Sequence, residues 1–366
     1  MLVMKLPEGL KRTGFLPLIL LFLLLIHSPL FGAVIPCEWS GIDKIVAVGD
    51  IHGDYDNLVF ILQKNGLIDG DLRWSGEKTH LVQLGDIMDR GPDARKVFDL
   101  LMRLEKEAPL CGGRVHVLLG NHEESNLTGN AFDYPGYVKV EQFVSFLPDD
   151  YRRNEETSFL KKTGEVVVRS SDPSSSLPEA LRDFWSKKMK ERGPQNKYFE
   201  NIYRKYGKWL LTKNVIIQIN EIVFVHGGVS ERLSTWDLSR LNDVARKEIR
   251  IIRRSRFDPE SFPRFRPEIA YRDDGLYWHR EYVLNGEETL NMDLTRVLKN
   301  LGASVMVVGH TTLKKESLTL EDVQRYDGRL YAIDTGIGKT YGSRIYALLY
   351  NRGEFSLWGG KNESLE

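Results

Sequence analysis

Short apolar runs alternate with helical stretches from residue 44 onward. Runs rich in Val, Ile and Leu at 44–48, 79–84 and 114–119 predict strands that are buried on both faces. Residues 57–64 and 94–107 lie between these runs and predict helices, because their apolar side chains recur at helical spacing. This βαβ order predicts an α/β fold built around a buried sheet.

The second half of the chain predicts further strands. Residues 215–219 and 222–225 form a predicted hairpin. Four more predicted strands are 304–308, 330–333, 344–350 and 354–358. Segment 134–213 is polar and irregular, and we expect it to be a mostly helical insertion. The catalytic domain that contains it is expected to span residues 40–360.

The N-terminus has the layout of a secretory signal peptide. Basic side chains precede the apolar run 15–26, and small or turn-forming residues follow it. This run is shorter than the roughly 20 apolar residues that cross a bilayer. We therefore expect residues 1–33 to be a signal peptide and the protein to be exported, either periplasmic or secreted. A short membrane anchor through residues 15–26 is the alternative.

Charge and cysteine content narrow the range of partners. Lys plus Arg equals Asp plus Glu, at 51 each, so the formal net charge is zero. We expect no nucleic acid as partner, and a membrane only if the N-terminal segment stays uncleaved. The only cysteines, Cys37 and Cys111, are too few for a zinc site or a disulfide framework. One bridge and two unpaired thiols both stay open.

Each of the first three predicted strands runs directly into a polar cluster. The clusters are 49–53 (Gly-Asp-Ile-His-Gly), 85–91 (Gly-Asp-Ile-Met-Asp-Arg-Gly) and 120–123 (Gly-Asn-His-Glu). His226 and His310 follow two later strands, so four of the eight histidines lie at strand ends. Because ligands bind at the carboxyl ends of strands in open α/β sheets, we expect the five loops to converge on one site.

The clusters combine Asp, His and Asn without a thiolate. Oxygen and imidazole donors together suit manganese, iron or zinc rather than a soft ion. A carboxylate such as Asp86 can bridge two ions. A single Asp-x-His or Gly-His sequence is more often a turn or a satisfied core histidine. Five such clusters, each at a predicted strand end, favour a metal site instead.

In this order the five clusters resemble the motif series of the phosphoprotein phosphatase (PPP) family. Residues 206–211, 220–230 and 274–280 are most similar to the Shewanella-like phosphatases of bacteria and organelles. The resemblance implies a calcineurin-like metallophosphoesterase fold, with a central β-sandwich flanked by helices and the active site at the C-terminal ends of the strands. Residues 334–342 depart from the eukaryotic serine/threonine enzymes, and Tyr341 is a candidate pocket residue without an assigned role.

Carried over residue by residue, the resemblance implies two divalent metal ions, manganese first, with iron or zinc as alternatives. Their ligands would be Asp50, His52, Asp86, Asn121, His226 and His310, with Asp86 as the bridge. His122, oriented by Asp89, would be the general acid that protonates the leaving group. Arg90, Arg280 and Asn121 would bind the substrate phosphate, since a guanidinium offers paired donors to a tetrahedral oxyanion.

These assignments predict an enzyme that hydrolyses phosphomonoesters with a metal-activated hydroxide. The leading hypothesis is a metal-dependent phosphoprotein phosphatase, whose partner is a protein or peptide phosphorylated on serine, threonine or tyrosine. The alternative is hydrolysis of dinucleoside polyphosphates or of another small phosphate ester, because the same metal constellation serves related enzymes. An inactive phosphate-binding module is the third hypothesis, and it would require loss of a ligand or of the acid.

Overall fold

The computed structural model describes residues 35–164, 177–257 and 265–361. The predicted signal peptide at 1–33 and its alternative, an anchor through 15–26, lie outside the described residues. Within the described part of the chain, no helix is both long enough and apolar enough to cross a membrane. All the elements below belong to the unit that begins at Cys37.

A five-stranded sheet carries the first three polar clusters, in the order β11-β10-β2-β3-β4. Its strands are β2 (Lys44–Val48), β3 (His80–Gln83), β4 (Arg114–Val117), β10 (Arg344–Asn351) and β11 (Glu354–Lys361). The first three are parallel, and the last two add antiparallel pairs. Because the register pairs Val48 with Gln83 and Gln83 with Val117, the three parallel strands end side by side.

A six-stranded sheet, in the order β1-β5-β6-β7-β9-β8, carries the two later histidine clusters. Its strands are β1 (Glu38–Trp39), β5 (Ile216–Ile219), β6 (Ile222–Val225), β7 (Val305–Val308), β8 (Gln324–Arg325) and β9 (Leu330–Ala332). The register pairs Val225 with Val308 and Val308 with Ala332, so β6, β7 and β9 also end together. Both sheets contribute to one hydrophobic core. The predicted α/β fold with sheets flanked by helices is confirmed.

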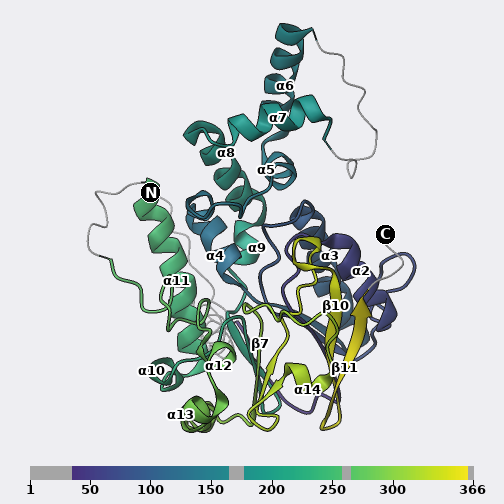
Figure 1. Cartoon of the computed structure of the whole chain (residues 1–366), viewed down its shortest axis with the longest axis vertical. Helices are drawn as coiled ribbons and strands as arrows, with labels where there is room; N and C mark the ends of the chain where they lie inside the picture. The colour runs from purple at the N-terminus through teal and green to yellow at the C-terminus, as the bar shows by residue number, and fades with distance from the viewer. Residues whose placement is uncertain (1–34, 165–176, 258–264, 362–366) are drawn as a thin grey trace, which may run out of the picture. The chain divides into compact units, whose positions relative to one another are not determined.

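Helices pack against both sheets (Figure 1). The helices that contact strands are α2 (Tyr55–Lys64), α3 (Ala94–Glu107), α11 (Leu238–Phe257) and α14 (Leu320–Val323). Two short helices, α10 (Glu231–Ser234) and α12 (Glu281–Leu284), pack against α13 (Glu287–Leu301). α2 begins two residues before the predicted start at 57. The reason is a cap: the Asp54 side chain accepts a hydrogen bond from the backbone N–H of Asn57, at 3.2 Å.

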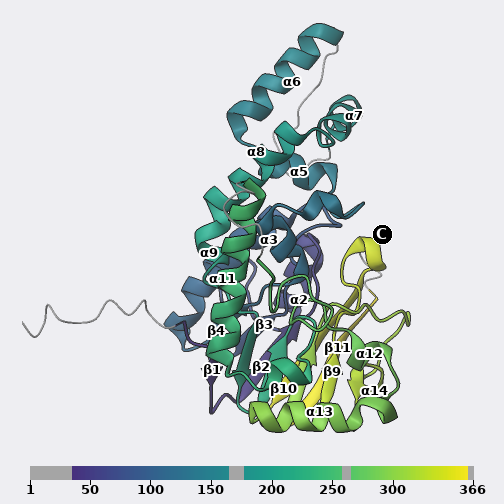
Figure 2. The ribbon, with the colours of Figure 1, turned by 90° about the vertical axis from the view of Figure 1, so that its left-hand side faces the viewer.

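Helices also dominate the described part of segment 134–213. They are α5 (Val140–Phe146), α6 (Asp149–Thr163), α7 (Glu179–Lys188), α8 (Arg192–Ile202), a π-helical turn (Tyr203–Gly207) and α9 (Lys208–Leu210). α5 contacts α3, and Figures 1 and 2 show α5 to α8 grouped on that side of the sheets. Aromatic side chains fill the space between these helices, with Phe143, Trp185 and Tyr198 fully buried. The segment therefore has its own aromatic core.

The two cysteines are free thiols. Cys37 is buried, whereas Cys111 is exposed at the end of a 3-10 helix (Ala108–Cys111) that follows α3. Of the two arrangements that the sequence leaves open, two unpaired thiols is the one observed. The fold therefore owes none of its stability to a bridge between them.

Candidate metal centre and active site

The five polar clusters meet where the parallel strands of both sheets end. A cavity of about 600 Å³ opens there, and its lining includes His52, Asn121, His122, His310, Arg90 and Arg280. The three remaining predicted ligands are Asp50, Asp86 and His226, and all are almost fully buried. The structure thus brings every predicted site residue to one place, although the loops that carry them are far apart in sequence.

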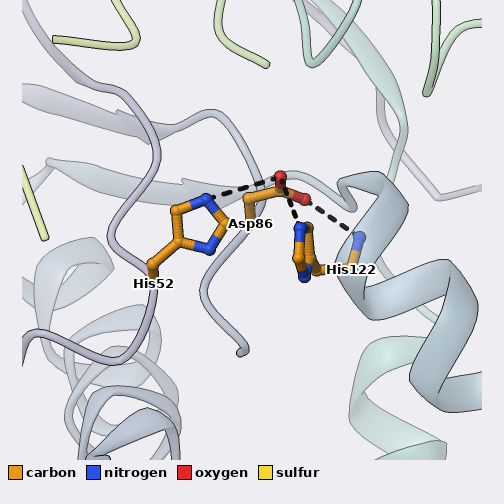
Figure 3. Close-up of side chains that lie close together, drawn as sticks. All are labelled: His52, Asp86 and His122. Atoms are coloured by element: carbon orange, nitrogen blue, oxygen red, sulfur yellow. Dashed lines mark hydrogen bonds and ion pairs between the residues drawn. The ribbon is translucent and has the colours of Figure 1, made fainter. Parts of the chain in front are cut away.

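Asp86 lies close to several imidazole rings, and Figure 3 shows it between His52 and His122. Its Oδ2 lies 3.9 Å from His52 Nε2 and 3.8 Å from His122 Nε2. Its Oδ1 lies 3.3 Å from His226 Nε2. Among the described residues, two groups of three have donor atoms within 4.8 Å of one another: His52, Asp86 and His122, and Asp86, His226 and His310. Asp86 belongs to both groups, as a bridging carboxylate would.

Two histidines are held so that one nitrogen is free for an ion. His52 Nδ1 lies 3.0 Å from the carbonyl oxygen of Met88, and His226 Nδ1 lies 2.9 Å from that of Leu84. A carbonyl oxygen only accepts, so Nδ1 donates in both rings and Nε2 keeps its lone pair when the ring is neutral. Burial, with His122 beside it, lowers the pKa of His52 to about 3, so this ring is neutral at physiological pH.

The surroundings of His226 fit a cation. Its Nε2 lies 3.0 Å from Asn121 Oδ1 and 3.3 Å from Asp86 Oδ1. In a neutral ring these are three acceptors that face one another without a proton between them. A metal ion resolves such an arrangement, because imidazole, amide and carboxylate are all ligands of manganese, iron and zinc. The residues present therefore fit the metals that the sequence predicts.

Buried negative charge also favours cations here. Asp50, Asp86 and Asp334 are each no more than 2% exposed. Burial raises the pKa of Asp50 well above its usual value, and the nearby Asp334 adds to this effect. Burial alone would raise the pKa of Asp86 too, but His226 and His122 hold it well below its usual value. Several carboxylates that are buried together are stable only when cations or protons compensate them.

Asp50 has a different environment from the other predicted ligands. Both of its carboxylate oxygens accept a hydrogen bond from the backbone N–H of His310, at 3.1 and 3.2 Å. It belongs to neither of the two donor groups, and His122 occurs in the first of them instead. The assignment of Asp50 as a metal ligand stays a prediction. What the structure shows directly is that Asp50 fixes the loop that carries His310.

Glycines allow the loops to approach one another closely. A Cβ on Gly120 would lie 2.1 Å from Asp86 Oδ1, and one on Gly309 would lie 2.4 Å from Asp50 Oδ1. Either contact would displace a buried carboxylate. Glycine is therefore required at the first position of both clusters, because no side chain fits there beside the buried carboxylates.

His122 and Asp89 form the pair expected of a general acid. His122 Nδ1 lies 2.8 Å from Asp89 Oδ2, and both side chains are at most 5% exposed. The carboxylate accepts, so Nδ1 donates and a second proton would sit on Nε2, which faces Asp86 at 3.8 Å. Burial lowers the pKa of His122, but Asp86 and the hydrogen bond to Asp89 raise it above its usual value overall. The charged form of the ring is thus more favoured here than in a free imidazole.

Both predicted phosphate-binding arginines line the cavity. The Arg90 guanidinium lies over the Tyr137 ring, 4.8 Å from its centroid, and donates to the carbonyl oxygen of Gly136 at 3.2 Å. Arg280 Nε donates to His310 Nε2 at 2.7 Å. A neutral His310 that accepts at Nε2 carries its proton on Nδ1. An ion held by either nitrogen of His310 would therefore take the place of the hydrogen bond from Arg280.

Three further residues shape the site without having been assigned a role from sequence. Glu123 accepts from the backbone N–H groups of Asp86, Ile87, Met88 and Gly120, at 2.8 to 3.0 Å. Asp334 accepts from Thr312 Oγ1 at 2.6 Å and lines the cavity. Tyr137 stacks on His122 with ring centroids 3.9 Å apart.

A sequence signal existed for two of these three. Glu123 stands at capping-box spacing, three residues after Gly120, and Asp334 follows a predicted strand as the other clusters do. No local pattern marks Tyr137. Tyr341, the candidate without a role, lines the cavity too, with its ring 5.0 Å from that of His52.

Comparisons with known proteins agree with this geometry. The model of the calcineurin-like phosphoesterase family matches residues 43–312. Shewanella-like protein phosphatase 1 of Plasmodium berghei is 27% identical over 82% of this chain and 68% of its own length. Shewanella-like protein phosphatase 2 of Arabidopsis thaliana is 29% identical over 74% of this chain and 66% of its own. The chain thus spans about two thirds of the length of these relatives.

A solved structure shares the fold. The cold-active protein-tyrosine phosphatase of a psychrophilic Shewanella species superposes with a TM-score of 0.63, at 24% identity, over 88% of this chain and 80% of that one. The predicted resemblance to Shewanella-like phosphatases is confirmed. Because the family model matches most of the chain, and the motifs of the sequence meet at one site, this chain belongs to the calcineurin-like phosphoesterase family.

Proposed function

We propose that the protein is a phosphoprotein phosphatase that uses two divalent metal ions, manganese first. The observation that carries the proposal is the position of Asp86. It is shared by two donor groups and lies beside His122, whose Nδ1 is 2.8 Å from Asp89 Oδ2. The similar Shewanella-like proteins are named as protein phosphatases, which supports a phosphoprotein as substrate. The cavity opens to solvent-exposed residues such as Arg280 and Lys314, so a phosphate attached to a larger molecule has room to enter.

The chain's own residues would divide the work as follows. Asp86, His226 and His310, with Asn121, His52 and Asp50, would hold the ions. When bound, such ions supply an activated water and neutralise charge on the phosphoryl group. Arg90 and Arg280 would bind the phosphoryl oxygens through their guanidinium donors.

His122 would complete the reaction by giving the proton at Nε2 to the leaving oxygen. Asp89 would hold the ring in place through Nδ1 and stabilise its charged form, as the 2.8 Å hydrogen bond and the raised pKa of His122 suggest. Tyr137 covers one face of the imidazole, which restricts rotation of the ring. A phosphomonoester with a poor leaving group, such as an alkyl phosphate, needs this proton most.

A substrate panel tests the proposal. The chelated protein should be inactive, and manganese should restore hydrolysis of phosphopeptides matched in sequence and differing only in phosphoserine, phosphothreonine or phosphotyrosine. A dinucleoside tetraphosphate serves as the competing substrate. A higher kcat/KM on the dinucleotide than on every phosphopeptide would favour the alternative function. Full activity of verified metal-free protein would overturn the metal mechanism.

Export is a further part of the proposal, and it rests on the layout of residues 1–33 alone. The mature chain should begin between residues 28 and 38 after cleavage. Sequencing the N-terminus of the protein from fractionated cells tests this. An intact N-terminus in the soluble cytosolic fraction would refute export, and an intact N-terminus in the membrane fraction would show an anchor through 15–26.

A further inference from the structure

The carboxylate that orients His122 is itself held by a residue from segment 134–213. Gln142, on α5, clamps Asp89 with both ends of its amide. Its Nε2 donates to Asp89 Oδ1 at 2.5 Å, and its Oε1 accepts from the backbone N–H of Asp89 at 2.6 Å. Both residues are fully buried. Asp89 therefore has its side chain and its backbone fixed by one side chain that lies 53 positions away.

A closed ring of hydrogen bonds extends this clamp. Gln142 Nε2 also donates to the hydroxyl of Tyr198 on α8, at 2.7 Å. That hydroxyl donates to Asn126 Oδ1 at 2.8 Å, and Asn126 Nδ2 donates to Asp89 Oδ2 at 2.9 Å. Asn126 belongs to α4 (Asn121–Thr128), the helix that begins at the predicted ligand Asn121. All four side chains of the ring are fully buried.

The ring leaves Asp89 little freedom. Oδ1 accepts from Gln142, and Oδ2 accepts from both His122 and Asn126. Asp89 also has a positive φ of 67°, a conformation that costs free energy in a residue other than glycine. A buried network in which each of these donors has a partner fixes its members in one arrangement. The hydrogen bond from the backbone N–H of Asp89 to Gln142 is one of the contacts that hold Asp89 in this otherwise unfavourable conformation.

We propose that helices α5 and α8 of segment 134–213 help to position the active site, and that Gln142 is a positioning residue for the general acid. Gln142 acts by fixing Asp89, which in turn fixes the imidazole of His122. Tyr198 supports Gln142 through the closed ring of hydrogen bonds. This inference rests on the proposed role of His122 as general acid. It assigns a function to a segment that contributes no predicted metal ligand, general acid or phosphate-binding residue.

The experiment compares two substrates in the full-length, manganese-loaded protein. Gln142→Met keeps the volume of the side chain and removes all three of its hydrogen bonds. It should lower kcat on an alkyl phosphate such as phosphoserine by about 10- to 100-fold, the range typical of an outer partner of a catalytic group. On p-nitrophenyl phosphate, whose leaving group needs no proton, the loss should stay under about threefold. Metal content should equal that of the wild type.

A double variant separates positioning from general damage. In a His122→Asn background the general acid is absent, so adding Gln142→Met should cost nothing further on the alkyl phosphate. Glu156→Gln is the matched control, because it perturbs a buried 3.0 Å hydrogen bond from Trp185 in the same segment without touching Asp89. It should leave the ratio of the two rates unchanged.

Several outcomes would overturn the inference. Equal losses on both esters, additive losses in the double variant, or loss of metal would each show that Gln142 has only a structural role. If Gln142→Met does not fold, Tyr198→Phe removes one hydroxyl from the ring and should show the same substrate dependence, at about two- to fivefold. If His122→Asn shows no dependence on the leaving group, the proposed general acid is wrong and this inference falls with it. If His122→Asn shows the dependence and Gln142→Met does not, only the inference is wrong.

Discussion

Two regions of the protein are built in opposite ways. One is the edge at which the parallel strands of both sheets end, and the other is segment 134–213. At the edge, five of the site residues have a positive φ although they are not glycine: His52, Asp86, Asp89, Arg90 and His310. None of the described residues of 134–213 other than glycine has one. Unfavourable backbone conformations persist only where the surrounding structure enforces them. Of the 13 such residues in the described part of the chain, five therefore lie at the site and none lies in the described part of 134–213.

The buried side chains of the two regions differ in the same way. The edge buries carboxylates and imidazoles, such as Asp86 and His226, whose desolvation costs free energy. Segment 134–213 buries aromatic side chains, with Phe143 and Tyr198 packed at a centroid distance of 5.5 Å. The edge thus contains buried polar groups that cost free energy, whereas segment 134–213 supplies rigid packing. Gln142 is the point at which the rigid region holds the strained one.

Substitution of Asp86, the carboxylate shared by both donor groups, should have the largest effect at the strand ends and little effect on segment 134–213. Asp86→Asn removes a negative charge that lies within reach of four imidazoles. We expect kcat to fall on the order of 10³-fold or more, because mutation of a residue that only supports a metal ligand already costs about 10–100-fold. Metal per protein, measured by mass spectrometry, should fall below that of the wild type. The packing of 134–213 should not change. Wild-type metal content with near wild-type turnover would show that Asp86 is only a turn residue.

The general acid provides the next largest effect. His122→Asn should lower kcat by roughly 10²–10⁴-fold on phosphoserine and far less on an activated aryl phosphate. Asp89→Asn should show the same dependence more weakly, because it acts only on the orientation and charge of the ring. Steady-state rates on both esters at matched metal content measure this. Equal losses on both substrates would mean that His122 is a ligand or a structural residue, as its place in a donor group would allow.

The aromatic core of 134–213 should matter for stability rather than for chemistry. Trp185→Ala removes a fully buried indole and should destabilise the protein by about 3–5 kcal/mol. The value of kcat per folded molecule should change by only a few-fold for every ester. Urea unfolding and rates below the transition give both quantities. A selective loss on poor leaving groups would erase the contrast between the two regions.

Acid should reveal a buried histidine pair on the neighbouring strands β3 and β4. His116 Nε2 lies 3.1 Å from His80 Nδ1. Burial lowers the pKa of His80 to about 4, helped by Arg114, and burial with His80 beside it lowers that of His116 well below its usual value. Both rings are therefore favoured in the neutral form. The stability they contribute is complete above pH 6.5 and is lost as the pH falls toward 4, in total by roughly 1–3 kcal/mol.

Unfolding curves across that pH range measure the effect. The slope of stability against pH should be smaller in His80→Gln than in the wild type, because one titrating ring is gone. An unchanged slope would show that other groups dominate acid sensitivity. The rates at the strand-end site are not needed for this measurement, so it tests the body of the fold alone.

The smallest expected effect concerns the hydroxyl of Tyr137. Asn121 Nδ2 donates to it at 3.3 Å, whereas the ring stacks on His122. Tyr137→Phe keeps the stacking and should change kcat by less than about threefold, since the net value of one such hydrogen bond is small. Tyr137→Leu removes the stacking and should cost about tenfold, mostly on poor leaving groups. Equal effects of the two substitutions would place the contribution in the hydroxyl instead.

Sequence alone determined the strands and the donors attached to them. The apolar runs are local signals, and the predicted strands at 44–48, 79–84 and 114–119 correspond to β2, β3 and β4 within two residues at each end. Each predicted ligand stands directly after such a strand or, as Asn121 does, at the start of the helix that follows it. Parallel register then brings the strand ends together without further information. For this reason the place of the site could be predicted from its motifs.

Only the tertiary structure decided how that site is held. The helix α4 was not predicted, because all eight of its residues are buried and most are polar, so it shows no apolar stripe. Gln142 lies 53 residues from Asp89, and Tyr198 lies 72 residues from Asn126. Such pairs leave no periodic or adjacent pattern in a single sequence. Their contacts exist because packing of the aromatic helices against α3 and α4 fixes their positions, and that packing is a property of the folded chain.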